Sequence, residues 1–358
     1  MNLLEAAKLG FFVCIVGCII IFAFVYVRNT IPKEDNEREL FPEIAECGDY
    51  PNELCSALFE GKAAASQIGH LCQQVLRRQE MSICIEMPCN CSTLQKELHF
   101  ITSPLSEEEG NFSLAYIITI HKELDMFIKL LRAIYVPQNV YCIHIDEKSS
   151  KDYKLAVQTV VNCFENIFIA SKVENVVYAG FSRLQADINC MKDLVHSKNQ
   201  WNYVINLCGQ DYPIKTNKEV MQYIKSKWNG KNMTPGIVQP PHMKHRTHKT
   251  STTWVTLLSI WLLDAPGATP DAQWEGNIRA IKWRDQEGIA HNGCQGHYVR
   301  DICVYGIGDL KWIVESPNLF ANKFESATYP LVMECLERHY RLKVLQEAEV
   351  PLETHWHL

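Results

Sequence analysis

The sequence LAYIITI, residues 114–120, is a continuous apolar run rich in β-branched residues. Such a run is typical of a strand that is buried on both faces of a parallel sheet. Residues 125–135 then carry apolar side chains at helical spacing, and Pro137 ends that pattern. A second run, VYCIHI at residues 140–145, predicts another buried strand that ends in Asp146. The order strand, helix, strand predicts a βαβ unit.

The same alternation continues along the chain. Residues 166–170 predict a third strand, Ser182 can cap a helix that runs to about Val195, and residues 203–207 predict a fourth strand. No internal repeat or low-complexity tract interrupts this pattern. The predicted fold class is therefore α/β, with a mainly parallel sheet.

The N-terminal region contains a candidate membrane anchor. Residues 9–27 are uncharged and almost wholly apolar, and about 20 such residues span a bilayer as a helix. The run ends in FVYV without a small-x-small cleavage site, so we expect an uncleaved transmembrane anchor. The predicted organisation is a cytoplasmic tail at 1–8, the anchor at 9–27, a stem at 28–46, a cysteine-rich cap at 47–113, a large α/β domain at 114–340 and a tail at 341–358.

Cysteine usage indicates the compartment. Thirteen cysteines follow the predicted anchor, a density that favours an oxidising environment. We therefore expect the large domain to lie in the lumen of the secretory pathway, with glycans on the sequons at Asn90 and Asn111. Pro235 weakens a third sequon at Asn232. The alternative is a cytosolic protein with many reduced thiols.

Charge and motifs exclude several functions. The net charge is −6 and basic residues do not cluster with aromatic ones, which argues against a nucleic-acid partner. The run HMKHRTHK at 242–249 fits a solvated loop better than a metal site, because cysteine and histidine pairs at zinc spacing are absent. The chain has no G-x-G-x-x-G, no P-loop and no G-x-S-x-G.

The ends of the predicted strands carry polar residues. In open parallel sheets, ligands bind outside the carboxyl ends of the strands, where this chain has His121, the segment 146–148 and the pair Gln210-Asp211. An aspartate there can bind a nucleotide or cap the next turn, and spacing does not separate the two. A metal-binding D-x-D motif is missing, and the nearest segment, DQE at 285–287, is typical of a solvated loop. A diphosphate would then need fixed cations, for which Arg300 and Lys323 are candidates unless they are ordinary surface charges.

Longer segments of the chain resemble the core-2/I-branching β-1,6-N-acetylglucosaminyltransferases. The matching segments are LRAIY and PQN within 131–139, YCIHID at 141–146, QADINCMKDL at 185–194, INLCGQDYPIKTN at 205–217, GDLKW at 308–312 and LFANKF at 319–324. The resemblance covers most of residues 50–340. It implies a GT-A-like, single-pass type II enzyme of the Golgi membrane. Such an enzyme transfers N-acetylglucosamine from UDP-GlcNAc to a sugar 6-hydroxyl of an O-glycan, with inversion and without a metal or other cofactor.

The resemblance also assigns roles to individual residues. It implies that UDP-GlcNAc contacts nine residues, with Arg300 and Lys323 at the diphosphate: Thr119, Ile120, His121, Asp146, Glu147, Lys148, Tyr178, Arg300 and Lys323. It implies four disulfides, Cys55–Cys335, Cys91–Cys163, Cys142–Cys190 and Cys294–Cys303, and a free thiol at Cys208. Four further cysteines receive no assignment: Cys47, Cys72, Cys84 and Cys89.

The chain departs from the family at the catalytic base. Inverting transfer needs a base that accepts the proton of the attacking hydroxyl, and the family uses a glutamate three residues before a Trp-(Ala/Val)-Thr segment. Here Ser251 precedes Trp254, and no acid lies between Gly230 and Leu263. By comparison with the family pattern, about seventy residues that relatives carry near 243–254 are also missing here. The catalytic residues are therefore unknown; Asp264, Asp271 and Glu275 are weak substitutes.

Two interpretations follow from this gap. The chain is either an incomplete product whose full counterpart is the enzyme, or a non-catalytic luminal protein that binds glycans or a partner. Because a truncated core and an unpaired sheet edge cost many kcal/mol against a net stability of about 5–15 kcal/mol, we expect this chain to be inactive and poorly folded. A purely structural anchor protein would bind no UDP.

Overall fold

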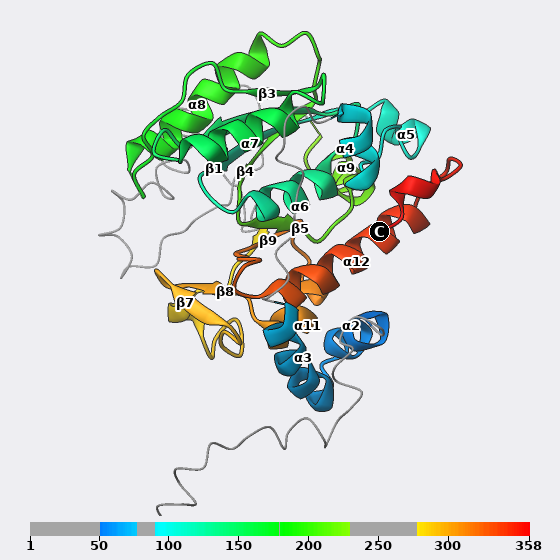
Figure 1. Ribbon diagram of the computed structural model, residues 1–358, viewed down its shortest axis with the longest axis vertical. Coiled ribbons are helices and arrows are strands. Elements are labelled where there is room, and N and C mark those ends of the chain that lie inside the picture. The colour runs from blue at the N-terminus through cyan, green and yellow to red at the C-terminus, as the bar shows by residue number, and fades with distance from the viewer. Residues whose placement is uncertain (1–50, 77–89, 179, 230–277) are drawn as a thin grey trace, which may run out of the picture. The chain divides into compact units, whose positions relative to one another are not determined.

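The computed structural model describes residues 51–76, 90–178, 180–229 and 278–358, and residues 50–358 form one compact unit (Figure 1). The predicted tail, anchor and stem lie outside the described residues. The segment 230–277 also lies outside the described residues. It contains Asn232, the histidine-rich run and the expected position of the base. None of the helices within the described ranges is both long and apolar enough to cross a membrane.

The main sheet has four parallel strands, as the sequence predicts. They are β1 (Leu114–Ile120), β2 (Val140–Ile145), β3 (Ile167–Ile169) and β4 (Tyr203–Cys208), in the order β3-β2-β1-β4. The predicted bounds of β1 and β2 agree with the structure, while β3 is shorter at both ends and β4 longer by one residue. All seven side chains of β1 are buried, which explains its uninterrupted apolar sequence.

Helices cover both faces of this sheet. The helices α6 (Leu124–Ile134), α7 (Lys151–Val161) and α9 (Asn217–Lys227) contribute to one hydrophobic cluster with the even-numbered side chains of β1. The helix α8 (Phe181–Val195) packs against Ala115 and Ile117 on the opposite face. Alternate side chains of β1 therefore belong to two apolar layers, one on each face of the sheet. The predicted fold class, α/β, is confirmed.

One helix start differs from the prediction. Gly180, not Ser182, is the N-cap residue of α8, and the Ser182 hydroxyl accepts a hydrogen bond from the Val177 amide at 2.8 Å. The helix begins one residue earlier than its capping signal, so the hydroxyl orders the preceding loop instead of the helix terminus.

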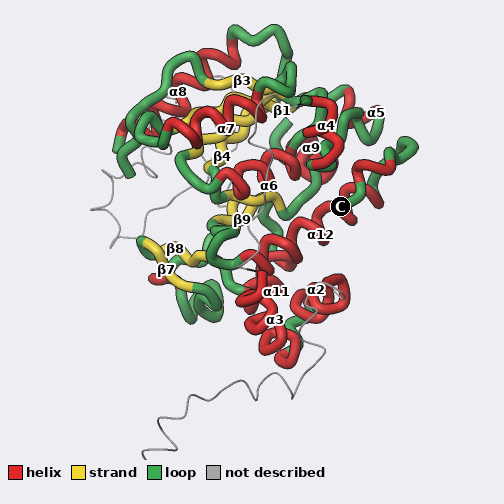
Figure 2. Tube along the Cα trace, in the orientation of Figure 1, coloured by secondary structure: helices red, strands yellow, loops and turns green. Residues whose placement is uncertain are grey.

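A smaller sheet extends the structure beyond β4. It contains β5 (Asp211–Pro213), β9 (Phe320–Asn322) and β6 (Arg279–Ala280), with β9 in the middle, antiparallel to β5 and parallel to β6. A separate hairpin joins β7 (His297–Val299) to β8 (Ile302–Val304) (Figure 2). Short 3-10 turns lie nearby: η4 (Arg284–Gln286), η5 (Ile307–Asp309) and, near the C-terminus, η6 (Thr354–Trp356).

The N-terminal helices of the described region pack on its C-terminal part. The helices α2 (Pro51–Phe59) and α3 (Ala63–Leu76) both contact α12 (Pro330–Gln346), and α2 also contacts α11 (Leu310–Glu315). The short helices α4 (Cys91–Glu97) and α5 (Glu107–Gly110) follow. Leu94 and Phe100 belong to the main hydrophobic core, so the second half of the predicted cap packs directly on the α/β domain.

The structure contains the four disulfides that the resemblance implies, Cys55–Cys335, Cys91–Cys163, Cys142–Cys190 and Cys294–Cys303. Cys208 is the free cysteine of the described region, and burial beside Asp211 raises the pKa of its thiol to about 11. Cys72 is also disulfide-bonded. The two predicted glycosylation sites, Asn90 and Asn111, are exposed.

Candidate functional site

The carboxyl ends of β1, β2 and β4 meet at one edge of the main sheet. The Ile120 carbonyl accepts a hydrogen bond from the Asp146 amide at 2.9 Å, and the Thr119 carbonyl accepts one from the Gly209 amide at 3.0 Å. A Cβ atom at Gly209 would lie 3.1 Å from the Ile120 side chain, so the turn after β4 leaves little room for a larger residue. These bonds fix where the chain leaves each strand.

Asp146 orders the loop that follows β2. Its Oδ1 accepts hydrogen bonds from the amides of Lys148, at 3.0 Å, and Val176, at 3.3 Å. Its Oδ2 lies 3.7 Å from the Lys148 ammonium. The carboxylate therefore caps a turn, which was one of the two alternatives, and it joins this turn to the segment before Tyr178.

His144 also supports that segment. Its Nε2 accepts a hydrogen bond from the Glu174 amide at 2.8 Å, and the Glu174 carbonyl accepts one from the Glu147 amide at 3.1 Å. The His144 side chain is fully buried and its Nδ1 has no hydrogen-bond partner. Burial, and next the charge of Arg183, lower the pKa of His144 below 6.5. The imidazole is therefore neutral, with Nε2 free to accept.

We expect this histidine to make stability pH-dependent. Its pKa in the folded protein lies below that of the unfolded chain, so its contribution is complete above about pH 6.5 and is lost as the pH falls. Urea unfolding at pH 7.5 and pH 5.5 should show a smaller acid-induced loss for His144→Gln, whose amide oxygen can still accept from Glu174, than for the unchanged chain. Equal acid-induced losses of stability in the two proteins would contradict the assignment of this pH dependence to His144.

Arg300 lies in the two-residue turn between β7 and β8. Arg300 and Asp301 have φ angles of 53° and 67°, which L-residues adopt at a cost of about 1–2 kcal/mol each. The guanidinium of Arg300 lies 4.2 Å from the centre of the Tyr178 ring, which itself is 61% exposed. The strained turn thus brings a cation and an aromatic ring from distant parts of the chain together.

Lys323 reaches the same place from the end of β9. Its amide donates to the Cys303 carbonyl at 3.3 Å, and its carbonyl accepts from the Tyr305 amide at 3.1 Å. Burial lowers the pKa of Lys323. The charge of Glu325 raises this pKa, whereas the charges of Lys122 and Arg300 lower it further. Desolvation, followed by the charges of Lys122, Lys148 and Arg300 against that of Asp146, lowers the pKa of His121.

These mutual effects define one region, the strand-end surface. Its members are His121, Lys122, Asp146, Lys148, Tyr178, Arg300, Lys323 and Glu325. Neither Arg300 nor Lys323 forms an ion pair with a carboxylate of the described part of the chain. Among the described residues, the strand-end surface therefore holds two cations, Arg300 and Lys323, without a direct counterion, an arrangement suited to binding an anion.

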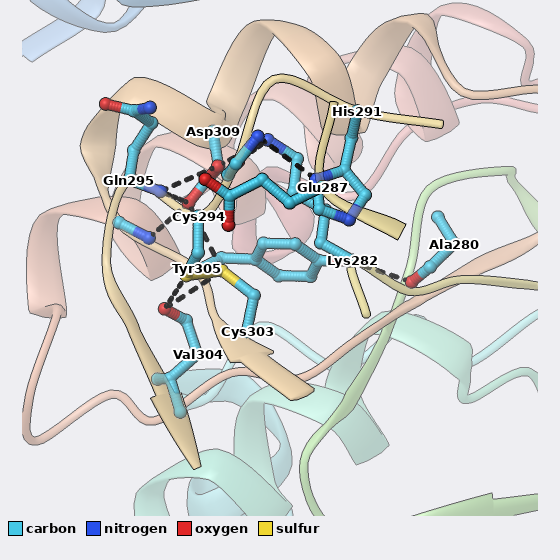
Figure 3. Close-up of polar contacts among 12 residues, drawn as sticks. Ala280, Lys282, Glu287, His291, Cys294, Gln295, Cys303, Val304, Tyr305 and Asp309 are labelled. Atoms are coloured by element: carbon cyan, nitrogen blue, oxygen red, sulfur yellow. Dashed lines mark hydrogen bonds and ion pairs between the residues drawn. A yellow bond between two sulfur atoms is a disulfide. The ribbon is translucent and has the colours of Figure 1, made fainter. Parts of the chain in front are cut away.

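A buried ion pair supports the hairpin that carries Arg300 (Figure 3). The ammonium of Lys282 lies 2.7 Å from Asp309 Oδ1, and both side chains are almost completely buried. The carboxylate of Asp309 also accepts hydrogen bonds from the amides of Gln295, at 3.1 Å, and Gly306, at 2.9 Å. The Cys294–Cys303 disulfide lies beside it, so the segments before and after the hairpin are fixed to one charged centre.

Cys294, Cys303 and Asp309 are close enough together to hold a metal ion. The two sulfur atoms form a disulfide and the carboxylate pairs with Lys282, so this cluster serves the structure. Thiolates, not disulfide sulfurs, are metal ligands.

Other predicted residues are placed as follows. The Ile120 side chain lies in the core, and the Thr119 hydroxyl donates to buried Asp187 at 3.4 Å, so both position their neighbours. Glu147 is exposed beside Lys154. Asp285 and Glu287 are exposed, as a solvated loop requires. The weak substitutes for the base, Asp264, Asp271 and Glu275, lie outside the described residues, as does Ser251.

Two residues of the strand-end surface were not predicted. Lys122 follows His121 directly, and its ammonium lies 3.5 Å from Glu325 Oε1. Gln210, which was noted as a strand-end residue, donates to the same oxygen at 3.1 Å. The rule that ligands bind at the carboxyl ends of parallel strands would have predicted Lys122 if it had been extended by one residue. Glu325 carries no such sequence signal, because the smaller sheet places it there.

Comparison with known proteins agrees with this geometry. The family model for the Core-2/I-Branching enzyme matches residues 114–260, which include the carboxyl ends of all four strands of the main sheet. The chain belongs to this family of glycosyltransferases. Its parallel four-stranded sheet fits the GT-A-like fold that the resemblance implies.

The relatives are named as β-1,6-N-acetylglucosaminyltransferases. The human "probable beta-1,3-galactosyl-O-glycosyl-glycoprotein beta-1,6-N-acetylglucosaminyltransferase 7" is 54% identical over 420 positions, covering all of this chain and 97% of the relative. The pig protein of the same name is 51% identical, with the same coverage. The human N-acetyllactosaminide β-1,6-N-acetylglucosaminyl-transferase is 41% identical over 93% of this chain and 95% of its own length.

The alignment with the first human relative is longer than this chain. It spans 420 positions, whereas the chain has 358 residues, so at least 62 aligned positions have no residue here. Because the alignment covers the whole chain, these positions lie within it. Their number is close to the roughly seventy residues expected to be missing, and their location near 243–254 stays a prediction.

Proposed function

We propose that this chain is a Golgi glycosyltransferase-type protein that binds UDP-GlcNAc at the strand-end surface, and that its complete relatives transfer N-acetylglucosamine in β-1,6 linkage to O-glycans. The observation that carries the proposal is the pair of cations, Arg300 and Lys323, neither of which forms an ion pair with a described carboxylate. The names of the relatives support the reaction class and the glycan acceptor.

Each part of the donor has a suitable partner. Arg300 and Lys323 bind the diphosphate oxygens, so no metal is needed to neutralise them. Tyr178, stacked under Arg300, offers an exposed aromatic face to the nucleotide. His121, Asp146, Glu147 and Lys148 lie at the strand ends, where a nucleoside binds in open α/β sheets.

We place the protein in the Golgi membrane as a single-pass type II protein with its C-terminal domain in the lumen. Four long- and short-range disulfides support an oxidising compartment. Residues 9–27 provide the membrane segment in this proposal.

Transfer needs a general base, and by comparison with the family pattern this chain lacks the family's catalytic glutamate. The acceptor 6-hydroxyl forms a bond to the anomeric carbon, the bond from that carbon to the β-phosphate oxygen breaks, and UDP leaves with the electron pair. A base must take the hydroxyl proton, and the family's glutamate is replaced by Ser251. We therefore propose that this chain binds donor but does not turn it over at ordinary enzyme rates. A non-catalytic luminal binding role is the second candidate, favoured by the same substitution.

Calorimetry with UDP tests the proposal. In EDTA the purified chain should bind UDP, and Arg300→Ala or Lys323→Ala should weaken binding about 10- to 100-fold, since each removes a charge-assisted hydrogen bond. The matched control is Arg338→Ala, which removes an equal charge from a partly exposed ion pair on α12. No UDP binding, or binding only with added manganese, would disprove the donor site. Transfer to a mucin-type core disaccharide would disprove the loss of turnover.

A further inference from the structure

Lys122 occupies a distinctive position on the strand-end surface. It follows β1 directly, and its backbone is held because its carbonyl accepts a hydrogen bond from the Tyr153 hydroxyl at 3.2 Å. Its side chain is about half exposed, and its charge lowers the pKa of both His121 and Lys323. The backbone of Lys122 is thus fixed, while its long, movable side chain carries an ammonium group beside the two cations of the proposed diphosphate site.

Two carboxylates hold this ammonium in the protein without ligand. Glu123 lies 2.8 Å away and Glu325 lies 3.5 Å away. Glu325 does not depend on Lys122, because it also accepts hydrogen bonds from Gln210 at 3.1 Å and Thr328 at 3.2 Å. Withdrawal of Lys122 therefore leaves Glu325 with two donors.

We propose that Lys122 is a third cation of the donor site, one that exchanges Glu325 for phosphate oxygens when the nucleotide carries a free terminal phosphate. This inference rests on the proposed function. It assigns Lys122 the role of a residue that distinguishes UDP from UDP-GlcNAc, with Arg300 and Lys323 serving both.

The physical reason is the difference in charge between the two nucleotides. A phosphate monoester has a second pKa of about 6, so UDP carries roughly one more negative charge than UDP-GlcNAc at pH 7.5. Two fixed cations match the two charges of the sugar nucleotide. The additional charge of UDP attracts a further cation, and Lys122 is close, exposed and on a flexible stem.

Calorimetry of the purified chain at pH 7.5 with UDP and with UDP-GlcNAc tests this role. In Lys122→Met, the affinity for UDP should fall about tenfold or more, while that for UDP-GlcNAc changes less than about threefold. The matched control is Lys225→Met, which removes an equally charged, similarly exposed lysine 3.1 Å from Glu108 and should leave both affinities unchanged. Because the Lys122 side chain is exposed, unaltered thermal unfolding should accompany the change.

A second variant separates Lys122 from a general effect of charge. Glu325→Gln should raise the affinity for UDP, and this gain should shrink in the double variant with Lys122→Met, because there is no ammonium left to release. Equal losses for UDP and UDP-GlcNAc in Lys122→Met, or no loss, would overturn the inference while leaving the donor site intact. Failure of the unchanged chain to bind either nucleotide would overturn both.

Discussion

Replacing both Cys55 and Cys335 by serine is expected to lower the free energy of unfolding by about 5 kcal/mol. The disulfide joins α2 to α12 across 280 residues, so its loss returns a large conformational freedom to the unfolded chain. Both sulfur positions are buried, which adds a cost for the new hydroxyl groups. Net stabilities are only about 5–15 kcal/mol, so urea unfolding should show a protein close to its limit of stability.

The control for this prediction is the short disulfide of the same protein. Cys294 and Cys303 are nine residues apart, and the same relation gives about 2.5 kcal/mol for replacing them with serine. Equal destabilisation by the two pairs of substitutions would mean that loop length does not govern the effect, and the argument from unfolded-state entropy would be wrong.

The sequence predicts the main sheet well for a physical reason. β1 and β2 are buried on both faces, so their apolar runs have no competing interpretation, and their bounds are correct. The prediction that Ser182 caps the helix was wrong because a serine hydroxyl near a helix start can accept a hydrogen bond from the helix or from the preceding loop. Here it accepts one from the Val177 amide in the loop. Local sequence does not show which of the two amides will come within reach.

The site was only partly predictable from local pattern. The strand-end rule found His121 and Asp146, since both follow runs that the pattern identifies. Arg300 and Lys323 follow three-residue strands, too short for a periodicity, so they were candidates only by their charge until the family resemblance assigned them. Glu325 and the Lys282–Asp309 pair had no signal, because each pairing depends on how the smaller sheet and the hairpin pack.

The hairpin explains why a strained turn can persist at the site. Arg300 and Asp301 both have left-handed backbone conformations without being glycine or asparagine. The cost is offset by the surroundings, which include the Cys294–Cys303 disulfide and the carboxylate of Asp309 bound to two backbone amides. Holding Arg300 over Tyr178 therefore depends on interactions buried below the surface.

Lys282→Met is expected to destabilise the protein by about 3–5 kcal/mol, because it leaves the buried carboxylate of Asp309 without its counterion. In the double variant with Asp309→Asn, the loss should be smaller than in Lys282→Met alone. The amide oxygen can still accept from Gln295 or Gly306, and no unpaired charge remains. Urea unfolding of the unchanged chain, of Lys282→Met and of the double variant measures the order of their free energies of unfolding.

The partly exposed pair of Arg338 and Glu334 on α12 is the matched control. Glu334→Gln removes a charged partner at a similar distance from a pair that water reaches, and should cost at most about 1 kcal/mol. If the double variant at positions 282 and 309 were less stable than Lys282→Met, the isolated charge would not be the cause of the loss. If Lys282→Met weakened UDP binding at a temperature where it is fully folded, the buried pair would also be shown to position Arg300, because Lys282 itself lies beneath the surface, 3% exposed.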